Sequence, residues 1–222
     1  MPKETFEKLP KEKREAFIKA FLEEFAAKNY DKASISVVVK KLKIAKGSVY
    51  QYFENKLDLY LYLKYLCEGI KMRYVLALDR ANYPDFWDYY RAQYECGIQF
   101  DLEHPLESQF LYRIGEKETS EVLKELTKEW KARAIQAYSA VIQGEIDKGY
   151  FRDDISAEVM THFLVSVSMG IGDVLRQQYD IDFDENIKQG KPVFALDRTL
   201  LMKAVDDQIA LLKGALNKAV TR

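Results

Sequence analysis

Apolar side chains recur along most of this 222-residue chain at intervals of three and four, the period of an α-helix with one buried face. Such stripes run through residues 11–28, 56–80, 120–148, 157–179 and 198–220. Hydrophobic residues make up 48% of the chain, with only 10 glycines and 5 prolines, so one or two compact domains with a sizeable core are expected. The pattern predicts an all-α protein.

Two shorter helices are predicted between residues 34 and 53. Ser34 is a residue type that caps helix N-termini, and the helix after it buries a face made of Ile35, Val38, Val39 and Leu42. A second helix, from about residue 45 to 52, turns Val49 and Phe53 inward. Residues 43–45 leave room only for a tight turn, so the pair is predicted to be a helix-turn-helix.

Charge is distributed unevenly along the chain. Residues 1–56 hold 13 Lys and Arg against 8 Asp and Glu, a net charge of +5, whereas the whole chain has −1 and residues 57–222 therefore −6. A basic N-terminal region attracts phosphates and an acidic remainder is repelled by them. This split favours a DNA-facing N-terminal region, although lysines also decorate ordinary helix surfaces.

The predicted second helix carries a recognisable motif. Residues 46–53, Lys-Gly-Ser-Val-Tyr-Gln-Tyr-Phe, followed by Lys56, resemble the recognition-helix signature of the TetR family of transcriptional regulators, Lys-Gly-Thr-Leu-Tyr-x-Tyr/His-Phe-x-x-Lys. Residues 21–31 resemble the end of that family's first helix, and the likeness extends over about residues 11–66. Two turn positions depart from the family pattern: Lys43 stands where it favours Gly, and Ala45 where it favours Ser or Thr.

The resemblance implies a fold and a function. Residues 1–55 are expected to form a three-helix DNA-binding domain with the helix-turn-helix, and residues 56–222 a helical domain for effector binding and dimerisation. The implied protein is a cytoplasmic, ligand-responsive regulator, a repressor released from a palindromic double-stranded DNA operator by a small, largely apolar effector. The alternative is a helical ligand-binding protein or enzyme with a vestigial helix-turn-helix.

The residues expected to contact DNA are those left outside the buried face of the two short helices. They are Ser34, Lys46, Gly47, Ser48, Tyr50, Gln51, Tyr52 and Lys56. We expect the two lysines to contact phosphates, and the two tyrosines to bond phosphate or stack on sugar and thymine methyl groups. Gln51 and Ser48 can reach base edges, Gly47 allows a close approach, and Ser34 offers a phosphate contact at a helix N-terminus.

Aromatic residues are concentrated in the middle of the chain, with nine in the thirty residues from 83 to 112, or 30% against 13% overall. Such density can line an apolar ligand pocket, or it can fill the core of a helical domain. The candidate effector-binding residues are Trp87, Tyr90, Tyr94, Phe110, Trp130 and Phe163.

The two C-terminal stripes, residues 157–179 and 198–220, are the candidates for a dimer interface. The resemblance implies that these two helices pair with their counterparts in a homodimer, as a four-helix bundle. From the residues alone, both stripes could instead be buried within one chain.

Other chemistry finds little support in the sequence. Cys67 and Cys96 lie far apart without a C-x-x-C spacing, and neither His104 nor His162 has a partner at metal-ligand spacing. The segment 180–191 begins like a calcium-binding loop but lacks its glycine and final glutamate, and we read residues 180–195 as a polar loop. No nucleophile or phosphate-loop motif is present, so we expect no catalytic residues, metal or cofactor.

A membrane span is not expected either. The longest apolar run, residues 163–175, contains serines, glycines and Asp173, and the charged N-terminus lacks the apolar core of a signal peptide. Residues 1–10 are expected to form a short polar arm.

Overall fold

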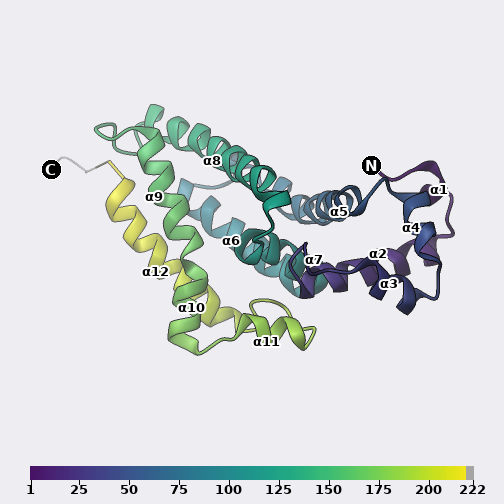
Figure 1. The fold of residues 1–222 in the computed structure, drawn as a ribbon. Helices are drawn as coiled ribbons and strands as arrows, with labels where there is room; N and C mark the ends of the chain where they lie inside the picture. Colours follow the sequence, from purple (N-terminus) through teal and green to yellow (C-terminus); the bar gives the residue numbers. More distant parts are fainter. Residues whose placement is uncertain (219–222) are drawn as a thin grey trace. The chain divides into compact units, whose positions relative to one another are not determined.

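The computed structural model describes residues 1–218, and of residue 134 only the backbone. In the described part of the chain the regular elements are helices and none is a strand, so the predicted all-α class is confirmed (Figure 1). The α-helices are α1 (Glu4–Glu7), α2 (Lys11–Ala27), α3 (Ile35–Leu42), α4 (Lys46–Tyr52), α5 (Lys56–Leu76), α6 (Phe86–Glu103), α7 (Pro105–Tyr112), α8 (Lys124–Asp147), α9 (Ala157–Met169), α10 (Ile171–Tyr179), α11 (Phe183–Lys188) and α12 (Arg198–Leu216). Between these helices lie short 3₁₀ turns at Arg80–Asn82 and Glu121–Leu123 and a π turn at Arg113–Lys117.

The chain divides into two compact units, each assembled from separate stretches of sequence. Unit 1 comprises Met1–Leu76, Gln99–Lys124 and Phe183–Ala195, and unit 2 comprises Ala77–Ile98, Glu125–Asp182 and Leu196–Arg222. The expected domain boundary after residue 55 therefore falls inside unit 1. The assignment of separate functions to residues 1–55 and 56–222 stays a prediction.

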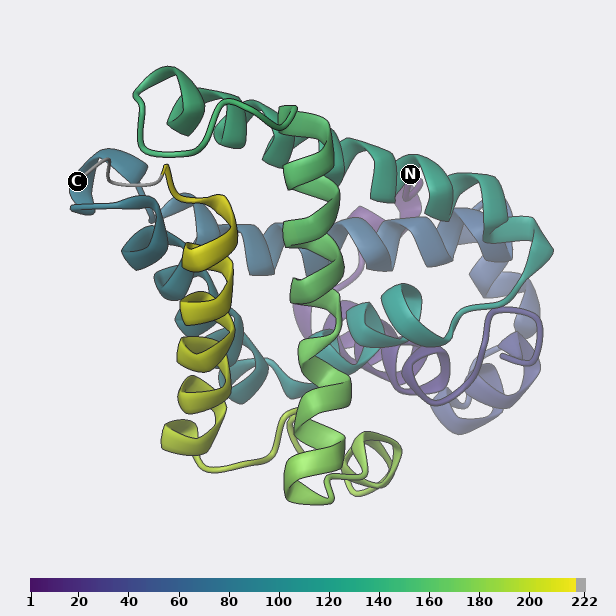
Figure 2. The same cartoon turned by 90° about the vertical axis from the view of Figure 1, so that its left-hand side faces the viewer.

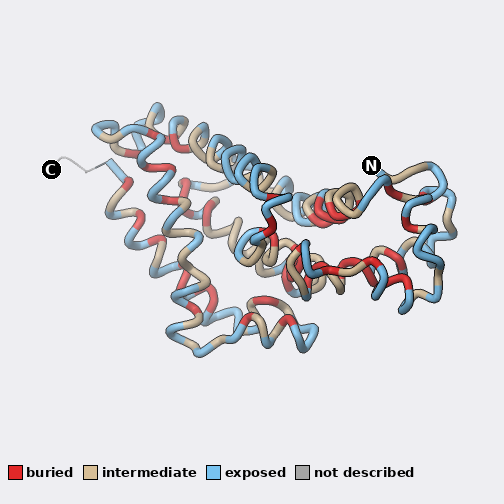
Figure 3. The backbone as a smooth tube through the Cα atoms, in the orientation of Figure 1, coloured by how far each residue is buried: buried red, intermediate tan, exposed pale blue. Residues whose placement is uncertain are grey.

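Aromatic side chains form the core of unit 1. Helix α2 packs against α3, α5 and α7, and Figure 3 shows buried residues along both α2 and α5. The buried rings of this core include those of Phe17, Phe21, Phe25, Phe53 and Tyr60. Their ring contacts are tilted, stacked or edge to face, and Phe25 meets Tyr60 edge to face at 5.1 Å between ring centroids. This core fixes α3 and α4 on the rest of the unit.

Unit 2 has a separate core between α6, α8, α9 and α12. Its members include Trp87, Tyr90, Ile142, Phe151, Leu164 and Leu212. Figure 2 shows α12 running beside α9 and α10, and the two pairs of helices are in contact. The buried Glu145 carboxylate receives two bonds from the Arg80 guanidinium, at 2.9 and 3.1 Å. This forked pair compensates a carboxylate that would otherwise be costly to bury.

The predicted single helix over residues 157–179 is interrupted at Gly170. The amide of Gly170 donates to both Ser166 and Val167 carbonyl oxygens, which tightens the end of α9 before α10 begins. A side-chain carbon at position 170 would meet the Val167 carbonyl oxygen at 3.4 Å, an ordinary van der Waals contact, so the bend does not require glycine. By length and composition this stretch alone, within residues 1–218, could span a membrane, but core helices of soluble proteins pass the same test. Met160, Leu164 and Leu175 are buried.

Two segments predicted to lack structure are folded. Residues 180–195 contain α11, and Phe183, Ile187 and Val193 are buried in unit 1. The buried Asp101 carboxylate holds this segment by accepting from the Val193 and Phe194 amides at 3.0 and 2.9 Å. Residues 1–10 contain α1, so the predicted polar arm was wrong as well.

Three predicted helix ends differ from the structure. The helix expected over residues 56–80 ends at Leu76, and the one expected to begin at residue 120 begins as an α-helix at Lys124. The last helix ends at Leu216, and the expected residues 219 and 220 lie outside the described residues. Helix ends are poorly fixed by apolar periodicity, because the stripe continues while the backbone pairing changes.

Candidate nucleic-acid interface

The helix-turn-helix forms where the sequence predicted it. Val38, Val39 and Val49 are buried at the contact of α3 with α4, and Phe53 is fully buried after the end of α4. The turn is made by Lys43, whose φ of 56° and ψ of 39° are left-handed, and by Ala45 in an extended conformation. Lys43 therefore adopts the conformation for which glycine is suited, and an L side chain there is strained.

The outer face of α4 is open. Lys46, Gly47, Tyr50 and Gln51 are exposed, with Tyr50 at 43% of its full accessibility, and Ser48 is half-buried. A side-chain carbon at Gly47 would have no heavy atom within 4 Å, so internal packing does not require glycine there. These five predicted contact residues share one accessible surface.

Tyr52 differs from the other residues of α4. Its ring lies 5.6 Å from the centroids of both Phe6 and Phe17, so one side of the ring belongs to the core of unit 1. The side chain is half-buried. Its packing orients the hydroxyl end of the ring, and a contact with DNA remains a prediction.

Several lysines around the turn have no acidic partner. Among the described side chains, no carboxylate oxygen lies within 4 Å of the amines of Lys40, Lys43 or Lys46, whereas Lys41 pairs with Glu23. Lys40 lies in the last turn of α3, Lys43 lies in the turn itself, and Lys46 is the first residue of α4. Three uncompensated cations therefore lie in or beside one tight turn. Sequence reasoning singled out only Lys46, yet the spacing of Lys40 and Lys43 about the turn was available as a signal.

Lys56 lies in a different environment from Lys46. Its amine donates to the carbonyl oxygens of Tyr30 and Ala33, the latter at 2.6 Å, and lies 4.4 Å from the centre of the Tyr30 ring. Burial lowers the pKa of this amine, and the nearby Asp31, Glu118 and Glu24 carboxylates oppose that shift. Lys56 thus ties the loop before α3 to the start of α5, and its contact with phosphate stays a prediction.

Ser34 does not cap α3 with its side chain, contrary to the expectation from its position. Its backbone amide donates instead to the Glu24 carboxylate on α2, at 2.9 Å. Glu24 also pairs with Lys28 at 2.8 Å. The Glu24 carboxylate on α2 thus anchors the start of α3 in place of a side-chain cap, and the local sequence does not reveal this partner.

The candidate effector residues are divided between the two units. Phe110 belongs to the unit 1 core, where its ring contacts Tyr60 at 5.1 Å and Phe25 at 6.2 Å. Trp87 and Tyr90 are buried in the unit 2 core, and Tyr94 packs against that core. Trp130 on α8 is half-buried, while Phe163 on α9 is 46% exposed. The structure does not bring these six side chains together in one compact unit.

A polar network crosses the unit 2 core. The hydroxyl of Tyr90 bonds to those of Tyr94, at 3.2 Å, and Ser168, and Tyr94 donates to the Gln208 side chain at 3.1 Å. Burial raises the pKa of both phenols, so they keep their protons to a higher pH than an exposed tyrosine. Gln208 donates onward to the Val167 carbonyl oxygen. Sequence reasoning found the two tyrosines but not Ser168 or Gln208, whose polar partners come from distant helices.

An open depression of about 530 Å³ lies on the surface of unit 2. Its lining residues are Arg91, Glu95, Arg198, Thr199, Met202, Lys203, Asp206 and Asp207. Most of their charges are compensated, with Arg91 bonded to Glu95 at 2.6 Å and Asp206 at 2.7 Å. None of the candidate effector residues lines this depression. Within residues 1–218, no group of three His, Cys, Asp or Glu side chains is placed to hold a metal ion.

Comparison with known proteins places this geometry in a family context. Residues 17–63 match the sequence model described as bacterial regulatory proteins, tetR family. The chain is similar over 99% of its length to a TetR family transcriptional regulator from Chloroflexus aurantiacus J-10-FL, with 28% identity, 100% of that chain covered and a TM-score of 0.79.

More distant solved structures share the fold. Reduced NemR from E. coli is 12% identical, with 94% of this chain and 100% of that chain covered and a TM-score of 0.59. KstR2 of Mycobacterium tuberculosis, described as a ketosteroid transcriptional regulator, is 13% identical, with 96% and 98% covered and a TM-score of 0.56. No curated protein matches the sequence.

Proposed function

Because this chain is a TetR-family transcriptional regulator, we propose that it represses transcription as a cytoplasmic homodimer bound to a palindromic DNA operator. A small, largely apolar effector releases it. The observation that carries the proposal is the accessible face of α4 beside three uncompensated lysines. An exposed recognition helix with cations at its start suits a major groove flanked by phosphates.

The proposed contacts follow from the exposure of each side chain. Lys46 lies at the first turn of α4, where its amine and the free backbone amides of the helix start can both approach phosphate. Tyr50 and Gln51 project from the exposed side, within reach of base edges or sugar. Gly47 leaves the helix surface flat between them, which supports a close approach of the DNA backbone.

Exposed apolar residues on the C-terminal helices support the proposed dimer. Val159 and Phe163 lie four residues apart on α9 and are 59% and 46% exposed. Leu211 on α12 is 77% exposed and Val174 on α10 is 40% exposed. Water-exposed apolar side chains on neighbouring helices favour pairing with a second copy. Two copies would place two recognition helices on the two halves of a palindrome.

The polar network in unit 2 supports an effector of mixed character. Tyr90, Tyr94, Ser168 and Gln208 supply hydrogen-bonding groups inside a core that is otherwise apolar. A ligand with an apolar body and one polar group could replace part of this network while keeping its bonds satisfied. Coupling of about 1–3 kcal/mol between effector and operator is typical of such switches.

Fluorescence anisotropy with duplex DNA from upstream of the gene for this chain tests the proposal. We expect specific binding that weakens steeply as salt rises, because phosphate contacts release counterions. Lys46→Ala should weaken binding, whereas Lys128→Ala, at an exposed lysine of α8, serves as the matched control. Absence of binding at low salt, or equal binding by the Lys46 variant, would favour a helical ligand-binding protein or enzyme with an unused helix-turn-helix.

A further inference from the structure

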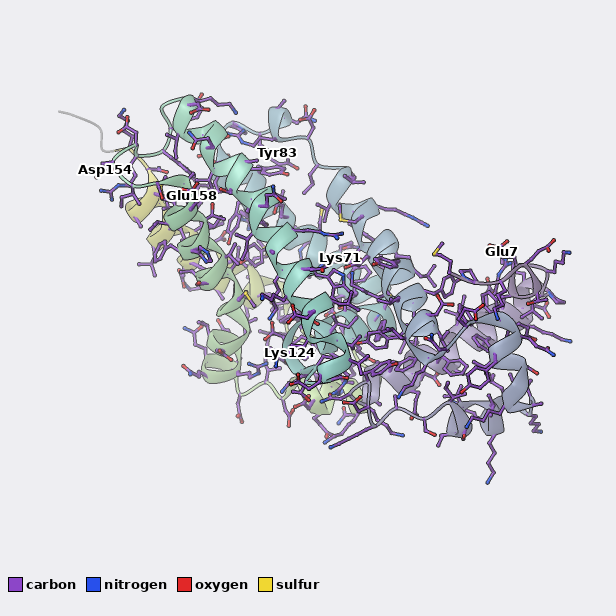
Figure 4. All side chains as sticks on the ribbon, turned by 45° about the horizontal axis from the view of Figure 1, so that its top comes forward. Glu7, Lys71, Tyr83, Lys124, Asp154 and Glu158 are labelled. Atoms are coloured by element: carbon purple, nitrogen blue, oxygen red, sulfur yellow. The ribbon has the colours of Figure 1, made fainter. Side chains whose placement is uncertain are left out.

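The first nine residues fold over the end of the recognition helix. We call residues 3–9 the N-terminal clamp; it contains α1, which contacts α4 (Figure 1). Phe6 is the anchor of the clamp, fully buried among four rings, with centroid distances of 5.0 Å to Phe53 and 5.3 Å to Phe17. The exposed Glu7, labelled in Figure 4, marks the solvent side of α1. The segment is therefore a packed part of unit 1.

The clamp satisfies the free carbonyl groups at the C-terminal end of α4. The last four carbonyl oxygens of a helix lack partners within it, and in α4 these belong to residues 49–52. The Phe53 amide donates to the first of them, the carbonyl oxygen of Val49, at 2.8 Å. The other three carbonyl oxygens accept from the clamp. The Lys3 amine donates to the carbonyl oxygen of Tyr50 at 3.1 Å, and the Thr5 hydroxyl donates to that of Gln51 at 2.5 Å. The Lys3 backbone amide donates to the carbonyl oxygen of Tyr52 at 2.8 Å.

This support matters because α4 is weak by itself. It has seven residues, fewer than a helix needs to be stable alone, and Ala45 offers no side-chain oxygen to cap its start. A positive amine beside its C-terminal end also complements the helix dipole. The Lys3 amine is held in turn by Glu54 at 2.8 Å. The clamp thus fixes the turn whose side chains, Tyr50 and Gln51, face outward.

We propose that the N-terminal clamp positions the last turn of α4 for DNA, with Lys3 and Thr5 as positioning residues that do not touch DNA themselves. The inference rests on the proposed function for the DNA-binding part of the claim. The fold-back geometry distinguishes it from a free basic arm that would enter a groove, because the Lys3 ammonium group and the Lys3 backbone amide both donate within the protein.

The experiment combines amide hydrogen exchange with operator anisotropy on the full chain. Thr5→Val removes the hydroxyl donor while keeping the side-chain shape, and Lys3→Met removes the amine while keeping the stem. Each should weaken operator binding about fivefold and lower the exchange protection of the Phe53 amide by about the same factor, the usual effect of one hydrogen bond. Thermal unfolding and circular dichroism confirm that each variant is folded.

Matched controls and conservative variants separate positioning from general stability. Lys8→Met removes an exposed lysine that pairs only across the surface of α1, and Thr199→Val alters an exposed threonine of unit 2; both should bind like wild type. Thr5→Ser and Lys3→Arg retain donors and should restore affinity and protection. Such rescue would not be expected if Lys3 and Thr5 only filled space, without donating hydrogen bonds to α4.

The outcomes are distinguishable. Unchanged affinity in Thr5→Val and Lys3→Met would overturn the inference, whether or not protection falls, because α4 would then not need the clamp to bind DNA. Weaker binding with unchanged protection would indicate direct DNA contact and would also overturn it. If the wild-type chain binds no DNA, the proposed function fails, and the exchange measurement alone still tests whether the clamp holds α4.

Discussion

Replacing Lys43 with glycine should stabilise the protein and weaken its binding to DNA. Lys43 has a φ of 56°, and the left-handed conformation costs an L residue about 1–2 kcal/mol, which glycine avoids. Glycine also makes the unfolded chain more flexible, at a cost of about 0.4–1 kcal/mol. The net gain is about 0.5–1 kcal/mol, or roughly 1–4 °C in melting temperature for a chain of this size.

The DNA effect of the same substitution has the opposite sign. Lys43 has no carboxylate within 4 Å among the described side chains, so its amine is available for phosphate. Its loss should reduce the slope of the logarithm of the DNA-binding constant against the logarithm of the salt concentration by about 0.9 for each phosphate contact removed. Differential scanning calorimetry and salt-dependent anisotropy measure the two effects separately.

Lys43→Ala is the matched variant, because it removes the same charge but keeps the left-handed strain. It should share the reduced salt slope of Lys43→Gly without the gain in melting temperature. If the glycine variant melts no higher than the alanine variant, strain at this turn does not limit stability and the physical argument for Lys43 is wrong.

Three other predictions concern the two units. Asp101→Asn should cost about 1–3 kcal/mol of unfolding free energy, because a buried amide replaces a carboxylate that accepts from the Val193 and Phe194 amides; urea unfolding measures it, and an unchanged midpoint would refute it. Burial raises the pKa of Tyr90 above its usual 10.0, so the contribution of Tyr90 to the unfolding free energy should be constant below that pH and fall as pH rises above it. Tyr90→Phe should flatten this alkaline decline, which phenolate absorbance can follow. Phe163→Glu should shift a dimer toward monomer in light scattering, and a variant that remains dimeric would exclude this face of α9 from the interface.

Local pattern was sufficient for the helix-turn-helix. The spacing of Val38, Val39 and Val49 fixes which sides of α3 and α4 meet, and a three-residue turn leaves few ways to connect them. The positions of Lys46, Tyr50 and Gln51 on the exposed side follow directly. The same periodicity located most of the longer helices, because each has one continuous apolar stripe.

Long-range contacts explain what the sequence did not reveal. Phe6 lies in a mostly charged segment without helical apolar periodicity, and distant rings, among them those of Phe17 and Phe53, give it a core to enter. The segment 180–195 is held by Asp101, which accepts from the backbone amides of Val193 and Phe194, more than ninety residues later in the chain. Lys56 likewise meets carbonyl groups that precede it by more than twenty residues. No local pattern encodes these partners.

The salt dependence of operator binding by wild type and Lys46→Ala most directly tests whether α4 binds DNA. A homodimer that uses Lys46 on phosphate in each half-site should lose about two units of log-log slope when both lysines are removed, with Lys128→Ala unchanged. An identical slope and affinity for Lys46→Ala and wild type would contradict the assignment of α4 as the DNA-contacting helix.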